Sequence, residues 1–352
     1  MIIKKFGHKL LVYFEKGVNM FPKETAYIIA NFGGPRNLTE IRPFLETLLT
    51  DPDVIRTKWP KFMQEWLFKK IAKRRAKKIQ KDYKKIGGKS PIFQDTENLA
   101  YALSEKLDKK VLTFHRYLPT THQNFIDEVN QLKVDEIKIF PMFPQFSYAT
   151  TGSIARFFSK HFEEQTLRKM RWIKSYPGSS HFINSYQKKI EGLFLEKDLK
   201  QDETMLLFSA HGVPEEFITS GDIYESECQI SFQRIMQKFP YVLGKLSFQS
   251  KFGKGEWIKP YTEKVCHSID DLSQGRKNII IVPLSFTSDH IETLYEIEYE
   301  YVPILRNKGY QVYRCPALNL DPNWISSIYE LLKSDDLLTN PMLIRKPLKE
   351  KN

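Results

Sequence analysis

The chain has 352 residues, enough for two domains of ordinary size, each built around its own core. Its hydrophobic content of 41% fits a folded globular protein, and no apolar run approaches the ~18 residues needed to span a bilayer. The net charge of +12 is concentrated in one segment and no nucleic-acid-binding module is recognisable, which argues against a nucleic-acid partner.

The stretch before residue 25 carries charges where a signal peptide would have its apolar core, so we expect a short extension on a cytoplasmic protein. Three cysteines lie far apart in the sequence, Cys228, Cys266 and Cys315. They indicate neither a disulfide framework nor a CxxC-type metal site. The sequence therefore favours a reducing compartment.

Predicted strands and helices alternate along the first half of the chain. The strands are 25–30, 110–115 and 136–141, and the helices are one that carries Phe44, Leu45, Leu48 and Leu49 and two more at 95–107 and 121–132. Such alternation is typical of a parallel sheet with helices packed on its faces.

Between the first two of these helices lies a basic and aromatic segment. Residues 69–89 contain eleven Lys or Arg and one acidic residue, Asp82. Large apolar side chains precede and overlap this run, namely Trp59, Phe62, Met63, Trp66, Leu67, Phe68 and Ile71. Apolar groups beside a basic stretch suit a membrane surface, or the lip of a pocket for an apolar anionic ligand. They also suit a solvated helix that packs on the domain by its apolar side.

The second half of the chain repeats this plan. Strands are predicted at 205–210, 245–249, 278–284 and 311–314, and helices near 181–195, 222–239 and 289–308. Residues 26–35 align without gaps on residues 205–214, and residues 137–142 resemble residues 279–284. We therefore predict two similar doubly wound α/β domains that face one cleft. In this alignment Phe32 takes the place that His211 has in the second half.

Two predicted strand ends carry the polar groups that suggest a site. His211 follows the strand 205–210, and the polar cluster 285–300 follows the strand 278–284. Because ligands bind beyond the carboxyl ends of strands in open α/β sheets, the two groups indicate a shared cleft. Taken alone, a histidine after a strand is also common as a hydrogen-bonded structural residue.

Within the cluster, Glu292, Glu296 and Glu300 recur every four residues and would form one acidic face of a helix. Carboxylates at this spacing suit cation binding or proton relay, because one can stay protonated while its neighbour is charged. For Glu300, a face exposed to water is the simpler interpretation. Glu292 lies beside the strand end and two residues after His290, and we expect it to be functional.

The chain resembles the ferrochelatases, which insert ferrous iron into a porphyrin, from about residue 25 to residue 325. Six motifs in the family's order carry the resemblance, at 31–35 (NFGGP), 87–92 (GGKSPI), 144–153 (PQFSYATTGS), 209–214 (SAHGVP), 248–253 (FQSKFG) and 288–296 (SDHIETLYE). The resemblance implies Fe²⁺ and a porphyrin as substrates in a late step of haem biosynthesis. Protoporphyrin IX is expected in preference to coproporphyrin III.

The resemblance also implies a domain plan of two Rossmann-like, chelatase-type domains, each with a parallel four-stranded sheet flanked by helices. The N-terminal domain is expected over residues 24–160 and carries the lip of the porphyrin pocket. The C-terminal domain, with the catalytic groups, is expected over 165–308. A closing strand and helix, 309–335, would pack back on the first domain, and 336–352 would form a flexible tail.

The resemblance further assigns roles to individual residues. His211 and Glu292 are expected to be catalytic and to bind the metal, and we expect His211 to accept the pyrrole protons, because a neutral imidazole titrates near neutral pH. Which of the two takes protons and which delivers metal stays open. A proton or metal path is expected along Asp289, His290, Glu296 and Glu300. The expected porphyrin contacts are Phe32, Arg75, Lys78, Tyr83, Ser90, Arg116, Tyr117, Trp257 and Phe286.

The sequence departs from the family at two places. Arg116-Tyr117 is followed by Leu118-Pro119, where many members have a histidine before the proline. Members with an iron–sulfur cluster have cysteines grouped near the C-terminus, and this tail has none, so we expect no cluster and no other required cofactor. The basic stretch and its apolar neighbours suggest peripheral contact with a membrane surface, and the oligomeric state stays open.

Two alternative interpretations use the same fold. The cobalt chelatases of corrinoid synthesis have a similar histidine at a strand end but lack the full set of motifs. A haem- or porphyrin-binding module without catalysis would also use such a histidine. The row of carboxylates that begins at Glu292 favours the enzyme, because binding alone needs no exit for protons.

Overall fold

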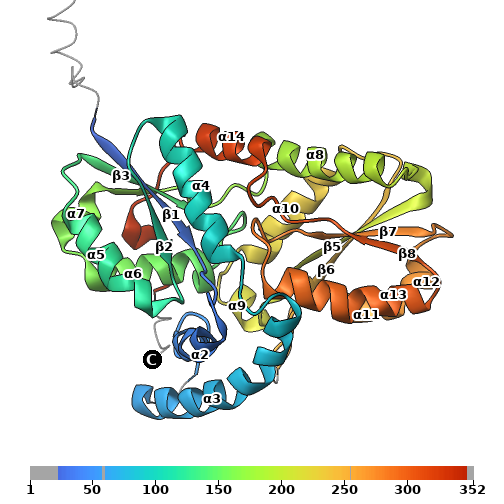
Figure 1. The fold of residues 1–352 in the computed structure, drawn as a ribbon, viewed down its shortest axis with the longest axis horizontal. Coiled ribbons are helices and arrows are strands. Elements are labelled where there is room, and N and C mark those ends of the chain that lie inside the picture. Colours follow the sequence, from blue (N-terminus) through green and yellow to red (C-terminus); the bar gives the residue numbers. More distant parts are fainter. Residues whose placement is uncertain (1–22, 58–59, 254, 347–352) are drawn as a thin grey trace, which may run out of the picture.

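The computed structural model describes residues 23–57, 60–253 and 255–346, which form two parallel four-stranded sheets (Figure 1). The first sheet contains β1 (Thr25–Asn31), β2 (Val111–His115), β3 (Glu136–Pro141) and β4 (Met170–Trp172). The second contains β5 (Thr204–His211), β6 (Leu243–Gln249), β7 (Asn278–Pro283) and β8 (Gln311–Arg314). The predicted N-terminal extension and Trp59 lie outside the described residues.

The two sheets have the same strand order, β2-β1-β3-β4 in the first and β6-β5-β7-β8 in the second. β1 and β5 therefore occupy equivalent places, as do β3 and β7, which are the pairs that the repeat in the sequence had matched. The strands β5 and β7 are buried along almost their whole length, because helices cover both faces of a parallel sheet. The prediction of two similar chelatase-type α/β domains is confirmed.

Helices flank both sheets (Figure 1). In the first half they are α2 (Ile41–Leu49), α3 (Lys61–Lys85), α4 (Ile92–Leu107), α5 (His122–Asn130), α6 (Ser153–His161) and α7 (Glu164–Lys169). In the second half they are α8 (Ser180–Glu196), α9 (Glu215–Thr219), α10 (Tyr224–Met236), α11 (Thr262–His267), α12 (Ile269–Leu272), α13 (Val302–Asn307) and α14 (Pro322–Leu331). The chain also forms two π-helices, η3 (Tyr148–Gly152) and η5 (Glu292–Tyr301), and a short 3-10 helix, η6 (Asn340–Leu343).

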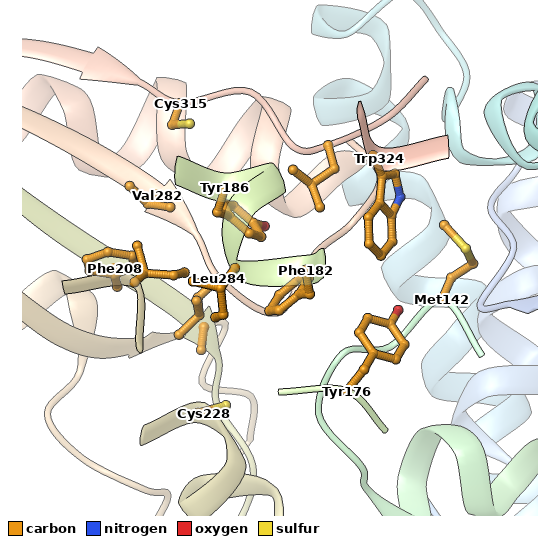
Figure 2. Packing of buried hydrophobic residues seen from close by; sticks show 14 of the residues in the cluster. Met142, Tyr176, Phe182, Tyr186, Phe208, Cys228, Val282, Leu284, Cys315 and Trp324 are labelled. Carbon is orange, nitrogen blue, oxygen red and sulfur yellow. The ribbon is translucent and has the colours of Figure 1, made fainter. Parts of the chain in front are cut away.

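The largest hydrophobic cluster joins the two halves. It contains Phe140 and Met142 from the first half together with Phe208 and Leu284 from the second. Figure 2 shows Phe182 and Trp324 of this cluster near Tyr176. Trp324 lies on α14, and this helix packs against both α4 and α8. The two sheets are therefore held together by one shared core, and the domain boundaries given above stay a prediction.

Residues 336–346 were expected to belong to a flexible tail, but in the structure this segment packs against the first half of the molecule. Leu338 forms an antiparallel bridge with Trp172 at the edge of the first sheet. Asn340 is buried and donates its side-chain N–H groups to the carbonyl of Ala155 and the hydroxyl of Ser159, on α6. Leu343 is fully buried. This segment, from 337 to 346, is called the C-terminal strap below.

Other differences concern short or unusual elements. The helix expected over 289–308 is the π-helix η5 followed by α13, and the break falls just before Pro303. β4 has three residues, too few to show a period of two, and α6 begins at the last residue of the motif 144–153, in a stretch for which no structure was predicted.

Candidate active site

A cavity of about 980 Å³ lies between the two halves of the molecule. Its wall includes the loop after β1, the helix α3, the end of β5 and the first turns of η5. Twelve of the predicted site residues line it, namely Phe32, Arg75, Lys78, Tyr83, Ser90, His211, Trp257, Phe286, His290, Glu292, Glu296 and Glu300. The volume is at the upper end of the ~300–1,000 Å³ of ordinary ligand pockets, so the cavity is suited to a large ligand.

His211 ends β5 and is held from three sides. Its backbone N–H donates to the hydroxyl of Ser285 at 2.8 Å, and its carbonyl accepts from the hydroxyl of Tyr224 at 2.9 Å. Its Nδ1 lies 2.8 Å from Oε2 of Glu292, on η5. Because a carboxylate can only accept, Nδ1 donates, and Nε2 keeps a lone pair for a proton or a metal ion. The residue after it must be glycine, since a Cβ at Gly212 would lie 2.9 Å from the carbonyl oxygen of Gln249.

The electrostatics of this pair make the imidazole of His211 a stronger base. Burial alone lowers the pKa of His211, but the charge and hydrogen bond of Glu292 outweigh it and raise that pKa above its ordinary value. Burial alone would raise the pKa of Glu292, but His211, and after it His290, lower that pKa by a larger amount. The pKa of Glu292 is therefore well below its ordinary value. The two side chains keep 37% and 24% of their surface exposed in the cavity. The pair can therefore hold a positive charge deep in the molecule and still reach a ligand.

Glu296 lies one step along η5 and has the opposite tendency. Its Oε2 accepts from Nε2 of Gln249 at 2.8 Å and from the hydroxyl of Ser250 at 2.5 Å. Burial and the nearby charge of Glu292 raise the pKa of Glu296 to about 8. The hydroxyl of Ser250 also lies 3.3 Å from Oε2 of Glu292. Two carboxyl groups with pKa values pushed apart and a shared hydroxyl between them form an arrangement that can pass a proton.

Two further residues of the predicted path lie at the edges of this arrangement. Nε2 of His290 is 3.8 Å from Oε2 of Glu292, and its Nδ1 is 3.2 Å from the carbonyl of Ser288. Glu300 is exposed, as its simpler interpretation predicted, and partial burial together with Asp82 raises its pKa. The row of glutamates therefore runs from the partly buried pair of Glu292 and His211 to Glu300, which is exposed to water.

Another part of the lining carries groups that suit carboxylates of a ligand. The Arg75 guanidinium lies 4.0 Å from the ring centre of Phe252, and burial lowers its pKa. The hydroxyl of Ser90 is buried without a hydrogen-bond partner in the described part of the chain. Burial and then Glu292 raise the pKa of Tyr83, so its phenol stays neutral. Lys78 also lines the cavity and lies close enough to lower the pKa of Glu300.

Three predicted site residues lie outside the lining of the cavity. Asp289 is bound to Arg314 at 2.9 Å and to Asn319 at 2.8 Å, which turns its carboxylate away from the row of glutamates. Arg116 is paired with the buried Asp51 at 2.6 Å. Tyr117 is 1% exposed and packs edge-on behind Phe32, with ring centres 4.5 Å apart. These three residues lie behind the lining of the cavity, and the porphyrin contacts expected of Arg116 and Tyr117, like the place of Asp289 in the path, stay predictions.

Sequence reasoning gave no role to four residues that hold the polar groups in place, namely Gln249, Ser250, Tyr224 and Ser285. Gln249 and Ser250 were inside a recognised motif, where Gln249 ends β6, the strand that neighbours β5, and Ser250 directly follows it, which is the signal that could have identified them. No such signal exists for Tyr224, because it reaches the site from α10 through a bond to backbone. The backbone carbonyl that Tyr224 binds cannot be inferred from the types of residue in the sequence.

The helix α3 forms the lip of the cavity, and its apolar residues divide between two faces. Phe62, Met63 and Trp66 are 73%, 46% and 60% exposed. Phe68 and Ile71 pack instead against the cluster around Phe44 and Leu45 of α2. One apolar face therefore packs on the core, as the interpretation of a solvated helix predicts, and the other face is exposed, where contact with a membrane stays a prediction.

Two absences apply to the described residues. Within 23–57, 60–253 and 255–346, no helix combines the length and the apolar character of a membrane span. In the same ranges, no group of three or more His, Cys, Asp or Glu side chains is arranged to hold a metal ion.

Comparison with known proteins gives a consistent result. The family model described as Ferrochelatase matches residues 24–336. A ferrochelatase of Chlamydia caviae is 42% identical over 321 residues, which cover 91% of this chain and 99% of that protein. A ferrochelatase of Chlamydia trachomatis serovar A is 42% identical over 320 residues, covering 90% and 99%. The solved structure of SirB from Bacillus subtilis with Fe³⁺ has a TM-score of 0.50 at 12% identity, covering 87% of this chain and 93% of that one, and supports the fold alone.

Proposed function

The chain belongs to the ferrochelatase family, and on this premise we propose that it inserts Fe²⁺ into protoporphyrin IX in preference to coproporphyrin III. It is a lyase of the porphyrin metal chelatase class and acts in haem biosynthesis. The observation that carries the proposal is the His211–Glu292 pair, whose free Nε2 faces a cavity large enough for a tetrapyrrole.

The reaction removes two protons from the ring while the metal enters. A free porphyrin has two pyrrole N–H groups, and each proton must leave before its nitrogen can bind Fe²⁺. Nε2 of His211 accepts a pyrrole proton, and the carboxylate of Glu292 stabilises the imidazolium that forms. The imidazolium gives its Nδ1 proton to Glu292, the hydroxyl of Ser250 passes a proton on to Glu296, whose pKa is raised, and Glu300 releases it to water. Exchange with water then moves the remaining imidazole proton from Nε2 to Nδ1 and frees Nε2 again. The second pyrrole proton leaves by the same route, so the products are haem and two protons.

The metal shares the same donors. Ferrous iron accepts both imidazole nitrogen and carboxylate oxygen, so His211 and Glu292 together suit its arrival before the porphyrin nitrogens replace them. We assign acceptance of the pyrrole protons to His211, and conduction of those protons or of the metal to Glu292 with Glu296. The hydrogen bond from Nδ1 supports this assignment, because it leaves Nε2 as the accepting nitrogen of the neutral imidazole.

The cationic and hydroxyl groups of the lining would fix the orientation of the ring. Arg75 and Lys78 would pair with its propionates, and the unpartnered hydroxyl of Ser90 would donate to one of them. Each charge-assisted hydrogen bond contributes roughly 1.5–3 kcal/mol, so a few such bonds position the ring and still permit release. Arg56 also lines the cavity, where its Nη1 donates to the hydroxyl of Ser220 at 2.8 Å while its Nε and Nη2 have no hydrogen-bond partner among the described residues. Arg75 and Lys78 are the two cations that we expect to pair with the two propionates of protoporphyrin IX.

We place the protein in the cytoplasm, in peripheral contact with a membrane through Phe62, Met63 and Trp66, where an apolar porphyrin would be exchanged. The ammonium of Lys70 lies 3.6 Å from the ring centre of Trp66, which brings a cation to the same face. We propose that no resident cofactor is required. The three cysteines support this part of the proposal, because each is free and buried on a different element, Cys228 on α10, Cys266 on α11 and Cys315 directly after β8.

One assay tests the proposed reaction. Purified protein is supplied with Fe²⁺ or Zn²⁺ under anaerobic conditions together with either porphyrin, and insertion is followed by absorbance. The expected result is insertion of Fe²⁺ with a higher kcat/KM for protoporphyrin IX than for coproporphyrin III. A higher value for coproporphyrin III would overturn the preference, and insertion into neither would overturn the activity.

A further inference from the structure

Arg314 makes two ion pairs that join the start of η5 to its middle. It ends β8 and is not part of the wall of the cavity. Its Nη1 donates to Oδ1 of Asp289 at 2.9 Å, and its Nε donates to Oε1 of Glu298 at 3.0 Å. The side chains of Arg314 and Asp289 are only 14% and 10% exposed. One guanidinium therefore binds the link before η5 and a residue seven positions into the helix.

Asp289 is itself bound to the first turn of η5. The hydroxyl of Thr293 donates to Oδ1 of Asp289 at 2.7 Å, the same oxygen that Arg314 binds. Asn319 donates to the other oxygen and accepts from the backbone N–H of Asp289. Oδ1 of Asp289, the first acceptor of Arg314, is thus held beside Thr293. The second acceptor, Glu298, follows Thr293 by five residues.

This five-residue interval depends on the form of the helix. In η5 the backbone bonds run from residue i+5 to residue i, as in the bond from the N–H of Val302 to the carbonyl of Ile297. Residues five apart are therefore one hydrogen-bonded turn apart and lie on the same side. In an α-helix, with 3.6 residues per turn, they would be separated by about 140° around the axis. Arg314 can hold both acceptors in the π form but not in the α form.

The same geometry sets the direction of the glutamates in the cavity. Glu292 reaches His211, and Glu296 reaches Gln249 and Ser250, from the side of η5 that faces the site. A change to the α form would rotate each residue beyond Thr293 by a progressively larger angle. Glu296 would then move away from its partners while His211 stayed in place on β5.

We infer that Arg314 is a positioning residue, which holds η5 in its π form from outside the cavity and so keeps Glu296 in line with Glu292. Its effect on metal insertion rests on the function proposed above, but its effect on the helix does not. The ion pair between Glu298 and Arg314 is the accessible half of this arrangement, because 37% of the Glu298 side chain is exposed.

The test uses the full-length protein with three substitutions. Glu298→Ala removes one ion pair at a partly exposed position, and Arg314→Lys keeps the charge but loses the planar fork that binds two acceptors. Glu330→Ala is the matched control, because it removes the exposed pair with Lys333 on α14, far along the chain from η5. Hydrogen–deuterium exchange is measured over residues 292–301, and KM is measured separately for Fe²⁺ and for porphyrin.

In Glu298→Ala and Arg314→Lys, the backbone amides of residues 292–301 are expected to exchange about tenfold faster, because one charge-assisted hydrogen bond is lost. Their KM for Fe²⁺ is expected to rise severalfold while KM for porphyrin stays within about twofold of the parent value. The control is expected to match the parent protein. Unchanged exchange over 292–301, or an equal rise of both KM values, would overturn the inference. If the parent protein inserted no metal, the proposed function would fail, and the exchange rates would still decide whether Arg314 holds the helix.

Discussion

At the scale of single residues, the site depends on a histidine whose two nitrogens have different tasks. Nδ1 of His211 is engaged with Glu292, and Nε2 is left for the ligand. The sequence could predict both residues, because each stands in a motif at a strand end. It could not predict that they touch, nor that Gln249 and Ser250 bind Glu296, since these contacts join β5, β6 and η5.

Replacing His211 by alanine is expected to lower kcat for metal insertion by about 10²–10⁴-fold, the usual contribution of a positioned general base. Binding of porphyrin, measured by fluorescence quenching, should remain, because the lip and the apolar wall are unchanged. His267→Ala is the control, since His267 is exposed on α11 and outside the cavity. Near-normal insertion by His211→Ala would exclude the assigned role.

Glu296→Gln is expected to change the pH dependence of stability. The folded pKa of about 8 is above the ordinary value of 4.5, so the folded state binds more protons than the unfolded state between these values. Stability of the parent protein therefore falls as pH rises through this window, and glutamine removes that loss. The variant should gain on the order of 1–3 kcal/mol at pH 8.5 and almost nothing at pH 4.5.

Urea unfolding of Glu296→Gln and parent protein at the two pH values measures this difference. Glu330→Gln serves as the control, because Glu330 is a surface residue whose partner is also exposed. The same gain at both pH values would mean that the charge of Glu296 does not oppose folding.

At the scale of elements, the sequence located most helices and strands but not the form of η5. A repeat of four residues between glutamates predicts one face on an α-helix, and it is equally compatible with the wider π-helix that is present. The choice between them depends on groups outside the helix. For α3, a packed and an exposed face were both expected, and only the packing against α2 shows which apolar residues remain exposed.

Changing Phe62, Met63 and Trp66 together to serine is expected to weaken binding to anionic vesicles by more than about tenfold. Each exposed apolar side chain buried in a membrane interface contributes about 1.5–3 kcal/mol, and 1.4 kcal/mol corresponds to a factor of ten. Co-sedimentation with liposomes measures the effect. The matched control changes Tyr101 and Tyr241, which are 68% and 74% exposed on other parts of the surface. Equal binding by the two proteins would leave α3 without a membrane role.

At the scale of the whole molecule, the repeat in the sequence predicted two sheets of one topology. The apolar strands and the motifs at their ends were enough for this, because each sheet is built from contacts that local patterns report. The union of the sheets was not predictable in the same way. The two sheets are joined through α14, and the role of this helix is visible only in the folded protein, where α14 packs against both α4 and α8.

Trp324→Ala is expected to lower the free energy of unfolding by about 3–5 kcal/mol, because a fully buried side chain would leave a cavity between the halves. Trp324→Phe should cost less, since the indole N–H is buried without a partner among the described residues and its loss breaks no hydrogen bond. Urea unfolding followed by circular dichroism compares the two. Equal losses would show that the ring volume at this position is unimportant.

The C-terminal strap has a practical consequence for anyone who shortens or fuses this protein. Leu338 covers the outer edge of β4, whose free backbone groups would otherwise be open to strands from other molecules. A chain truncated before residue 337 would keep its catalytic groups and gain an uncovered edge that invites aggregation. Purification tags are therefore better joined beyond the strap than in place of it.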